Sequence, residues 1–186
     1  SDRRSIVPED AFRLTDLGAV ALSPSGRTVA YCASRWTDGV REHSLLVTEV
    51  RTGDTRVLSQ GHENIHAPQW SSDESTIHFA AAGESEESQI WRISRDGSDK
   101  TMDTGMEGGI ARFRLGESDQ SVYFTRHVAA PEDEWESLHE KFRGSVVAGD
   151  GRQEKSELWR GDFENGESRI EWNGGRFITS FAVSPD

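Results

Sequence analysis

Residues 22–31 read Leu-Ser-Pro-Ser-Gly-Arg-Thr-Val-Ala-Tyr, and this stretch decides the fold because it returns along the chain. Residues 70–79 read Trp-Ser-Ser-Asp-Glu-Ser-Thr-Ile-His-Phe, 48 positions later, and residues 115–124 read Leu-Gly-Glu-Ser-Asp-Gln-Ser-Val-Tyr-Phe, 45 positions after that. Residues 181–186, Phe-Ala-Val-Ser-Pro-Asp, begin the pattern a fourth time. In each copy a polar turn separates an apolar residue from β-branched and aromatic residues, which predicts a turn between two strands.

A second strand pattern follows each of the first three copies. Residues 46–50 (Leu-Val-Thr-Glu-Val), 90–93 (Ile-Trp-Arg-Ile) and 158–160 (Leu-Trp-Arg) each precede a turn that contains glycine. Glycine supplies the positive φ that tight hairpin turns require. Residues 55–58 predict a further strand after the first of these turns. Four short strands in every roughly 45 residues are typical of the blades of a β-propeller.

We therefore expect an all-β fold: a β-propeller fragment of about three four-stranded antiparallel blades, with a short N-terminal helix and a helical insertion in the third blade. The expected boundaries are 1–18 for a helical lead-in, 19–66 for blade 1, 67–110 for blade 2, 111–180 for blade 3 with its insertion at about 129–155, and 181–186 for the start of a truncated blade 4. Three blades do not close a ring, so the two end faces are expected to be uncovered unless further protein packs on them. The side chains expected to pack between sheets include Val29, Tyr31, Ile77, Phe79 and Trp91.

Two segments outside the repeat predict helices. Residues 8–17 begin with Pro8, carry two acids in the first turn and precede Gly18, which is placed to end a helix. Residues 132–142 lie within the insertion and place four side chains at helical spacing, namely Trp135, Leu138, His139 and Phe142.

The composition restricts the classes of partner. The net charge is −12 and the pI is near 4.9, so nucleic acids and anionic membrane surfaces are not expected partners. Only three of the 21 basic residues are lysine, a balance that fits either salt adaptation or a GC-rich genome, and we favour the second. The mean hydropathy is −0.70, yet six tryptophans and eight phenylalanines supply material for a core.

A single cysteine, Cys32, rules out an internal disulfide framework and is interpreted as an inert thiol in a buried strand. No stretch approaches the roughly 20 apolar residues of a membrane span. No signal segment is recognised at the start of the sequence, so we expect a cytoplasmic location.

The motifs of common catalytic and cofactor sites are not found in the sequence. It contains no G-x-S-x-G elbow, no H-E-x-x-H and no phosphate-binding glycine loop. We therefore assign no catalytic, cofactor-binding or metal-ligating residue and expect no cofactor. His62, His66 and His78 are interpreted as ordinary polar residues rather than metal ligands, because a connection between blades does not provide helical i,i+4 geometry.

Other polar and aromatic residues also have structural interpretations. The acidic pairs Glu86-Glu87 and Asp133-Glu134 are expected to lie on solvated surface, because adjacent side chains point apart. Trp91 and Trp159 occupy equivalent repeat positions and are expected to pack between sheets, whereas Trp36 and Trp135 are freer to form an interface.

The repeat motif resembles the propellers of the prolyl oligopeptidase family of serine peptidases, especially the acylaminoacyl-peptidase and dipeptidyl-aminopeptidase-like branch, and also the periplasmic propeller of the Tol system. Three stretches favour the peptidases. Residues 6–14 leading into 19–24 are similar to the opening of those enzymes, residues 133–142 followed by 156–160 to an insertion in that branch, and residues 177–186 to its next blade.

The resemblance implies a function for a longer parent protein. In that family a propeller of seven or eight blades covers an α/β-hydrolase domain, which follows it in the same chain, and restricts access to oligopeptide substrates. The catalytic Ser, Asp and His belong to the hydrolase domain, so no catalytic residue is carried over to this sequence. A non-enzymatic Tol-type or scaffold propeller that binds a protein partner is the alternative, and a stand-alone sensor domain is a third. Homo-oligomerisation is left open.

Overall fold

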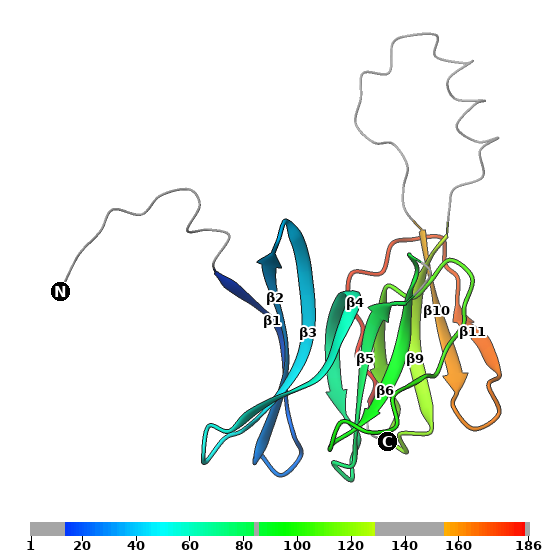
Figure 1. The fold of residues 1–186 in the computed structure, drawn as a ribbon. Coiled ribbons are helices and arrows are strands. Elements are labelled where there is room, and N and C mark those ends of the chain that lie inside the picture. The colour runs from blue at the N-terminus through cyan, green and yellow to red at the C-terminus, as the bar shows by residue number, and fades with distance from the viewer. Residues whose placement is uncertain (1–13, 84–85, 129–154, 185–186) are drawn as a thin grey trace. The chain divides into compact units, whose positions relative to one another are not determined.

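The computed structural model describes residues 14–83, 86–128 and 155–184, apart from the side chains of 62 and 63 (Figure 1). These residues form eleven strands and no helix. The strands are β1 (Thr15–Leu22), β2 (Thr28–Thr37), β3 (Val40–Glu49), β4 (Thr55–Trp70), β5 (Thr76–Ala82), β6 (Ser88–Ser94), β7 (Thr101–Met102), β8 (Arg112–Leu115), β9 (Ser121–Val128), β10 (Lys155–Asp162) and β11 (Ser168–Trp172). The all-β prediction is confirmed for this part of the chain, which contains no helix of the length and hydropathy needed to cross a bilayer.

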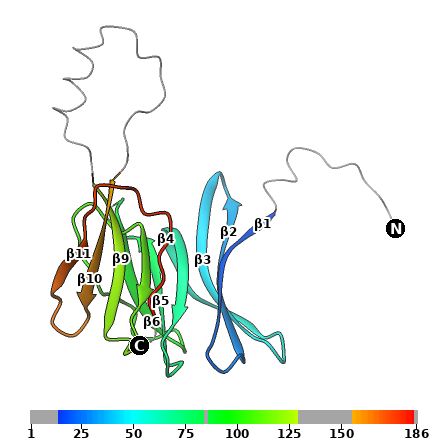
Figure 2. The same ribbon diagram turned by 180° about the vertical axis from the view of Figure 1, so that it is seen from behind.

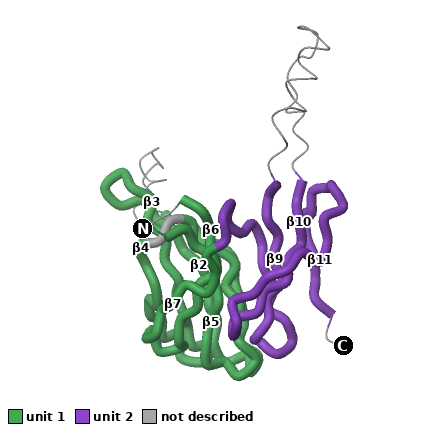
Figure 3. The backbone as a smooth tube through the Cα atoms, turned by 90° about the vertical axis from the view of Figure 1, so that its right-hand side faces the viewer, with its two compact units in different colours: residues 1–105 green, residues 106–186 purple. Residues whose placement is uncertain are grey.

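The chain divides into two compact units, residues 1–105 and residues 106–186, which Figure 3 colours separately. Unit 1 holds a seven-stranded antiparallel sheet in sequence order, and unit 2 holds a four-stranded antiparallel sheet in the order β11-β10-β9-β8. The long strand β4 pairs with β3 through residues 55–62 and with β5 through residues 63–70. Unit 1 is therefore two four-stranded sheets that share one strand, and Figures 1 and 2 both show β4 passing from one to the other.

We call β1–β3 with the first half of β4 sheet 1, the second half of β4 with β5–β7 sheet 2, and β8–β11 sheet 3. Three four-stranded antiparallel sheets are the architecture expected of three propeller blades. Strand β4 runs through the expected blade boundary at 66/67 without a break. Strand β4 forms backbone hydrogen bonds with β3 in sheet 1 and with β5 in sheet 2. The two sheets are therefore joined through this strand in addition to their side-chain packing.

The repeated turn has the same geometry in all three copies. Its left-handed position is filled by Gly26 (φ 70°), Glu74 (φ 60°) and Asp119 (φ 54°). In each copy the amide of this residue donates to the carbonyl three positions earlier, at 2.8, 3.1 and 3.2 Å respectively. Only glycine adopts this φ without strain. The two later turns nevertheless keep the geometry, although Glu74 and Asp119 are less favourable at this position.

The core of unit 1 lies between sheets 1 and 2. Ala30 and Val47 of sheet 1 pack in one buried cluster with Ile77 and Phe79 of sheet 2, and Trp91 packs against this cluster. Ile77 and Phe79 are fully buried, which confirms that they pack between sheets.

The opposite face of sheet 1, which we call its outer face, is much less covered. Equivalent cross-strand pairs show how the burial of the two sheets differs. The pair Tyr31 and Leu46 in sheet 1 occupies the repeat position that the pair Phe79 and Trp91 occupies in sheet 2. Tyr31 and Leu46 are half-buried, whereas Phe79 is fully buried. The apolar side chains that this face exposes most belong to β1, β3 and β4, namely Leu17, Val20, Leu22, Val40 and Val57.

The predicted N-terminal helix is wrong where the structure describes it. Residues 15–17 belong to β1 and pair with β2, while residues 8–13 lie outside the described residues. Gly18 does not end a helix; it lies at a bulge in β1, where a Cβ atom would approach Cβ of Cys32 to 3.4 Å. Local helix signals lose here to strand pairing, and glycine suits the bulge because it lets β1 approach β2 closely. The predicted helix at 132–142 also lies outside the described residues.

Candidate functional site

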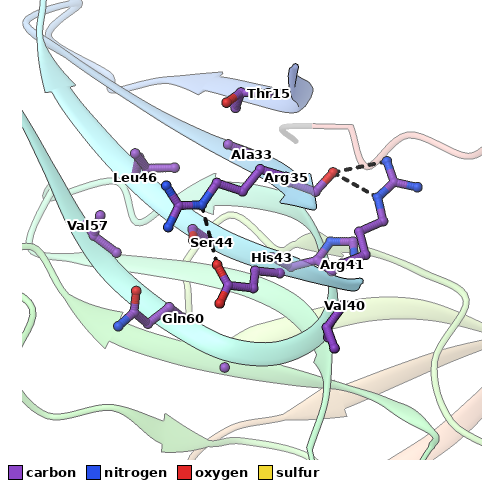
Figure 4. Close-up of a pocket in the computed structure, with 13 residues that line it drawn as sticks. Thr15, Ala33, Arg35, Val40, Arg41, His43, Ser44, Leu46, Val57 and Gln60 are labelled. Atoms are coloured by element: carbon purple, nitrogen blue, oxygen red, sulfur yellow. Dashed lines mark hydrogen bonds and ion pairs between the residues drawn. The ribbon is translucent and has the colours of Figure 1, made fainter. Parts of the chain in front are cut away.

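A pocket of about 710 Å³ opens on sheet 1 near the β2–β3 hairpin. Figure 4 shows that its wall combines charged, polar and apolar side chains, including Arg35, His43, Gln60 and Val57. Leu46 and Val57 extend the apolar outer face into the pocket. Such a lining offers both hydrogen-bonding groups and apolar contacts.

The charged groups around this pocket are already paired. Nε of Arg35 lies 3.4 Å from Oε2 of Glu42, which also accepts a hydrogen bond of 2.8 Å from the hydroxyl of Thr37. Nη2 of Arg41 lies 2.8 Å from Oδ2 of Asp16. These pairs are largely solvent-exposed, so they orient the side chains more than they stabilise the fold.

Asp16, Ser34 and His43 form one row across β1, β2 and β3, because Ser34 pairs with both of the others. A serine-peptidase triad needs the imidazole between the hydroxyl and the carboxylate, where it serves as the base. In this row the serine is in the middle, and its Oγ accepts hydrogen bonds from Nε and Nη2 of Arg41 at 3.2 and 3.0 Å. The guanidinium also pairs with Asp16, so the row orders Arg41 rather than activating Ser34.

A polar network joins sheets 1 and 2. Nη2 of Arg95, on sheet 2, donates to Thr28 Oγ1 at 2.9 Å and to Glu49 Oε1 at 2.8 Å on sheet 1. The carboxylate of Glu74 accepts hydrogen bonds from the amide and the hydroxyl of Ser25, which lies in the equivalent turn of the first repeat. The hydroxyl of Ser25 is the main cause that lowers the pKa of Glu74. We call this set of contacts the inter-sheet network.

The three histidines singled out from the sequence have different pairing partners. His66 pairs with Ala80, and its Nδ1 lies 2.7 Å from the carbonyl oxygen of Asn64. His78 is buried, and its Nδ1 lies 3.5 Å from Oδ2 of Asp103. His62 lies opposite His43 in the β3–β4 pairing. Among the described residues no three His, Cys, Asp or Glu side chains are close enough to hold a metal ion.

The remaining residues interpreted from the sequence have mostly structural positions. Cys32 is buried, and burial raises the pKa of its thiol to about 12. Glu86 and Glu87 are exposed, as predicted, while Asp133, Glu134 and Trp135 lie outside the described residues.

The tryptophans follow the repeat. Trp91 donates from Nε1 to the carbonyl of Ala81 at 3.1 Å, and Trp159 stacks on Phe124 with ring centroids 6.3 Å apart. The register repeats as well, since Trp91 pairs with Phe79 and Trp159 with Phe124. Trp36 is 41% exposed.

Sequence reasoning missed the inter-sheet network and the row of Asp16, Ser34 and His43. One signal for the network was present, because Glu74 stands where the turn favours glycine. An unfavourable residue at a left-handed position indicates a compensating contact. The row depends on the register of three strands and has no signature in the linear sequence.

No protein-family profile matches this chain. In sequence it is similar to dipeptidyl-peptidase 5 of Porphyromonas endodontalis, with 24% identity over 135 residues. That match covers 72% of this chain and 19% of the peptidase.

Solved structures with the same fold include peptidases and a Tol protein. The AtxE2 isopeptidase matches with a TM-score of 0.68 and 18% identity, over 90% of this chain and 32% of that one. Acylaminoacyl peptidase of Pyrococcus horikoshii matches with a TM-score of 0.62 and 13% identity, over 87% of this chain and 26% of that one. TolB of Acinetobacter baumannii matches with a TM-score of 0.58 and 16% identity, over 87% of this chain and 33% of that one.

The resemblance predicted from the sequence is confirmed. The structural neighbours include acylaminoacyl peptidase, and the curated relative is a dipeptidyl-peptidase. The chain spans no more than about a third of the length of each of these proteins.

Proposed function

We propose that this chain forms part of the propeller that restricts substrate access to the α/β-hydrolase domain of a serine oligopeptidase, and that this domain follows in the same parent chain. The observation that carries the proposal is the sequence similarity to a dipeptidyl-peptidase over 72% of the chain, together with a fold shared with acylaminoacyl peptidase. The parent protein would hydrolyse oligopeptides. Its Ser, His and acid would come from the hydrolase domain, because the row of Asp16, Ser34 and His43 has the wrong order for a triad.

The role of the described sheets in this proposal is mechanical. A propeller excludes large substrates only if neighbouring sheets stay in contact, and the inter-sheet network and the shared strand β4 maintain that contact in unit 1. The parent protein is expected to be cytoplasmic and to need no cofactor.

The test uses the full-length natural protein with a short chromogenic peptide, a peptide of about 30 residues and an unfolded protein as substrates. Arg95→Ala removes the hydrogen bonds to Thr28 and Glu49, so it should raise hydrolysis of the long substrates relative to the short one. Arg51→Ala, at an exposed turn, is the matched control. An unchanged ratio would contradict the gating role, and a full-length protein without peptidase activity would contradict the enzyme assignment.

A second candidate function is a non-enzymatic propeller that binds a protein partner, which the shared fold with TolB favours. The same experiment separates the two. A binding propeller would hydrolyse none of the substrates, and the sequence after residue 186 would encode further blades without a G-x-S-x-G elbow.

A further inference from the structure

A row of arginines crosses the whole of sheet 3. Arg114 on β8 pairs with Tyr123 on β9, Tyr123 pairs with Arg160 on β10, and Arg160 pairs with Arg169 on β11. Directly paired residues lie on the same face of a sheet, so all four side chains share one face. The three arginines are exposed, and Arg112 adds a fourth exposed arginine in the next row of that face.

The arginines on this face are positively charged, whereas the chain as a whole has a net charge of −12. Among the described residues, Arg169 is the member of the row with a carboxylate partner, since its Nε lies 2.9 Å from Oε1 of Glu171. Arg160 lies over the ring of Tyr123, with Cζ 5.6 Å from the ring centroid, and Arg114 donates to the carbonyl of Phe113 at 3.1 Å. Within the described part of the chain, Arg114 and Arg160 therefore have no carboxylate partner.

The internal repeat shows what such a row contacts. The equivalent row in sheet 1 consists of Ala21, Ala30, Val47 and Arg56, which are paired in the same way across β1 to β4. Ala30 and Val47 belong to the buried cluster between sheets 1 and 2. Arg56 donates to the carbonyl of Arg95 on sheet 2. In unit 1 this row therefore lies on the face of sheet 1 against which sheet 2 packs.

The surroundings of the row have the composition of an interface. Leu158 is half-buried and Trp172 is 39% exposed, and these two residues pair with each other in the row next to Tyr123 and Arg160. Arginine and aromatic side chains are enriched at the centres of protein interfaces. Burying arginines there without a counter-charge would be costly, so the covering surface must supply carboxylates. Arg95 and Glu49 form such a pair between sheets 1 and 2.

We propose that this face of sheet 3 is the docking surface for a further β-sheet of the same parent chain, and that this sheet presents aspartate or glutamate side chains to Arg114 and Arg160. The inference rests on the proposed function only in requiring that the parent protein contains further sheets. It does not depend on peptidase activity.

The test exploits the scarcity of lysine in these 186 residues, which contain only Lys100, Lys141 and Lys155. Arg160→Lys and Arg114→Lys each place one amine in the row of the full-length natural protein. A water-soluble carbodiimide then couples an amine to a carboxylate with which it forms an ion pair, and mass spectrometry identifies both residues. Arg51→Lys, at an exposed turn, is the control for nonspecific coupling. Circular dichroism confirms that each variant folds.

We expect an intramolecular cross-link from position 160 or 114 to an Asp or Glu beyond residue 186, at least five times more abundant than any cross-link from position 51. A cross-link between two copies would overturn the proposal in favour of self-association. Cross-links only to carboxylates of sheet 3, such as Glu171, or none in folded variants, would overturn it in favour of a solvated face. A protein without peptidase activity that still gives the expected cross-link would contradict the proposed function alone.

Discussion

Replacing Phe79 by alanine tests whether sheet 2 packs on sheet 1 as the structure describes. The side chain is fully buried in the cluster between the sheets, so its loss should lower the free energy of unfolding of unit 1 by about 3–5 kcal/mol. The equivalent residue Tyr31 is half-buried on the outer face of sheet 1. Full burial of a large apolar side chain contributes about 1.5–3 kcal/mol, so Tyr31→Ala should cost roughly half of that, about 1 kcal/mol.

Urea titration of the 186-residue chain, followed by tryptophan fluorescence, measures both losses. Trp70 and Trp91 report on unit 1, because the first belongs to the buried cluster and the second packs against it. With a slope of about 1–3 kcal/mol per molar urea, the Phe79 variant should lose at least about 1 M in its midpoint, and the Tyr31 variant much less. Phe79→Leu, which keeps most of the apolar volume, is the control for the size of the cavity.

Equal losses at the two positions would refute the reasoning, because they would mean that the outer face of sheet 1 is covered as well as the inner one. A loss below about 1 kcal/mol for Phe79→Ala would mean that the two sheets do not pack on each other.

The exposed apolar face of sheet 1 should make the 186-residue chain associate, and Val20→Glu, at a residue that is 64% exposed, should reduce that association in sedimentation velocity at several concentrations; a concentration-independent monomer before substitution would contradict this. The hydroxyl of Ser71, and next the amide of Ser75, lower the pKa of Asp73 from 3.8 to about 2, so the stability that this carboxylate contributes is fully present above about pH 4 and is lost as the pH falls toward 2. Between about pH 5 and pH 2.5 the urea midpoint should therefore fall less in the Asp73→Asn variant than in the unsubstituted chain. The difference should be small because Asp73 is solvent-exposed. An equal fall in both proteins would argue against these hydrogen bonds. Burial and a pKa of about 12 should keep Cys32 unreactive toward Ellman's reagent until urea unfolds unit 1, so rapid labelling of the folded chain would show that β2 is accessible.

The sequence repeat was sufficient to predict the strands and several core residues. Its period placed Ile77 and Phe79 in the same strand pattern as Val29 and Tyr31, and the structure pairs these residues at equivalent registers. It could not predict which face each neighbouring sheet covers, since that depends on tertiary packing.

Contacts that depend on cross-strand register were beyond the sequence. Arg114, Arg160 and Arg169 are far apart in the chain, and they align only through the pairing of four strands, including an irregularity between β10 and β11. The helix expected at 8–17 failed at 15–17 for a related reason. Pro8 and Gly18 are local signals, whereas the pairing of β1 with β2 is a long-range contact that local signals do not report.

The shared strand β4 affects how unit 1 loses its structure. A strand that belongs to two sheets cannot fray in one of them without loosening the backbone that the other uses, because residues 62 and 63 are joined by a peptide bond and pair with β3 and β5 respectively. In arrays of repeats, such nearest-neighbour coupling determines how far a local opening spreads. The amides of sheets 1 and 2 that exchange with solvent only through large openings should therefore exchange at similar rates, as one cooperative unit, whereas a flexible linker in place of β4 would let each sheet open by itself.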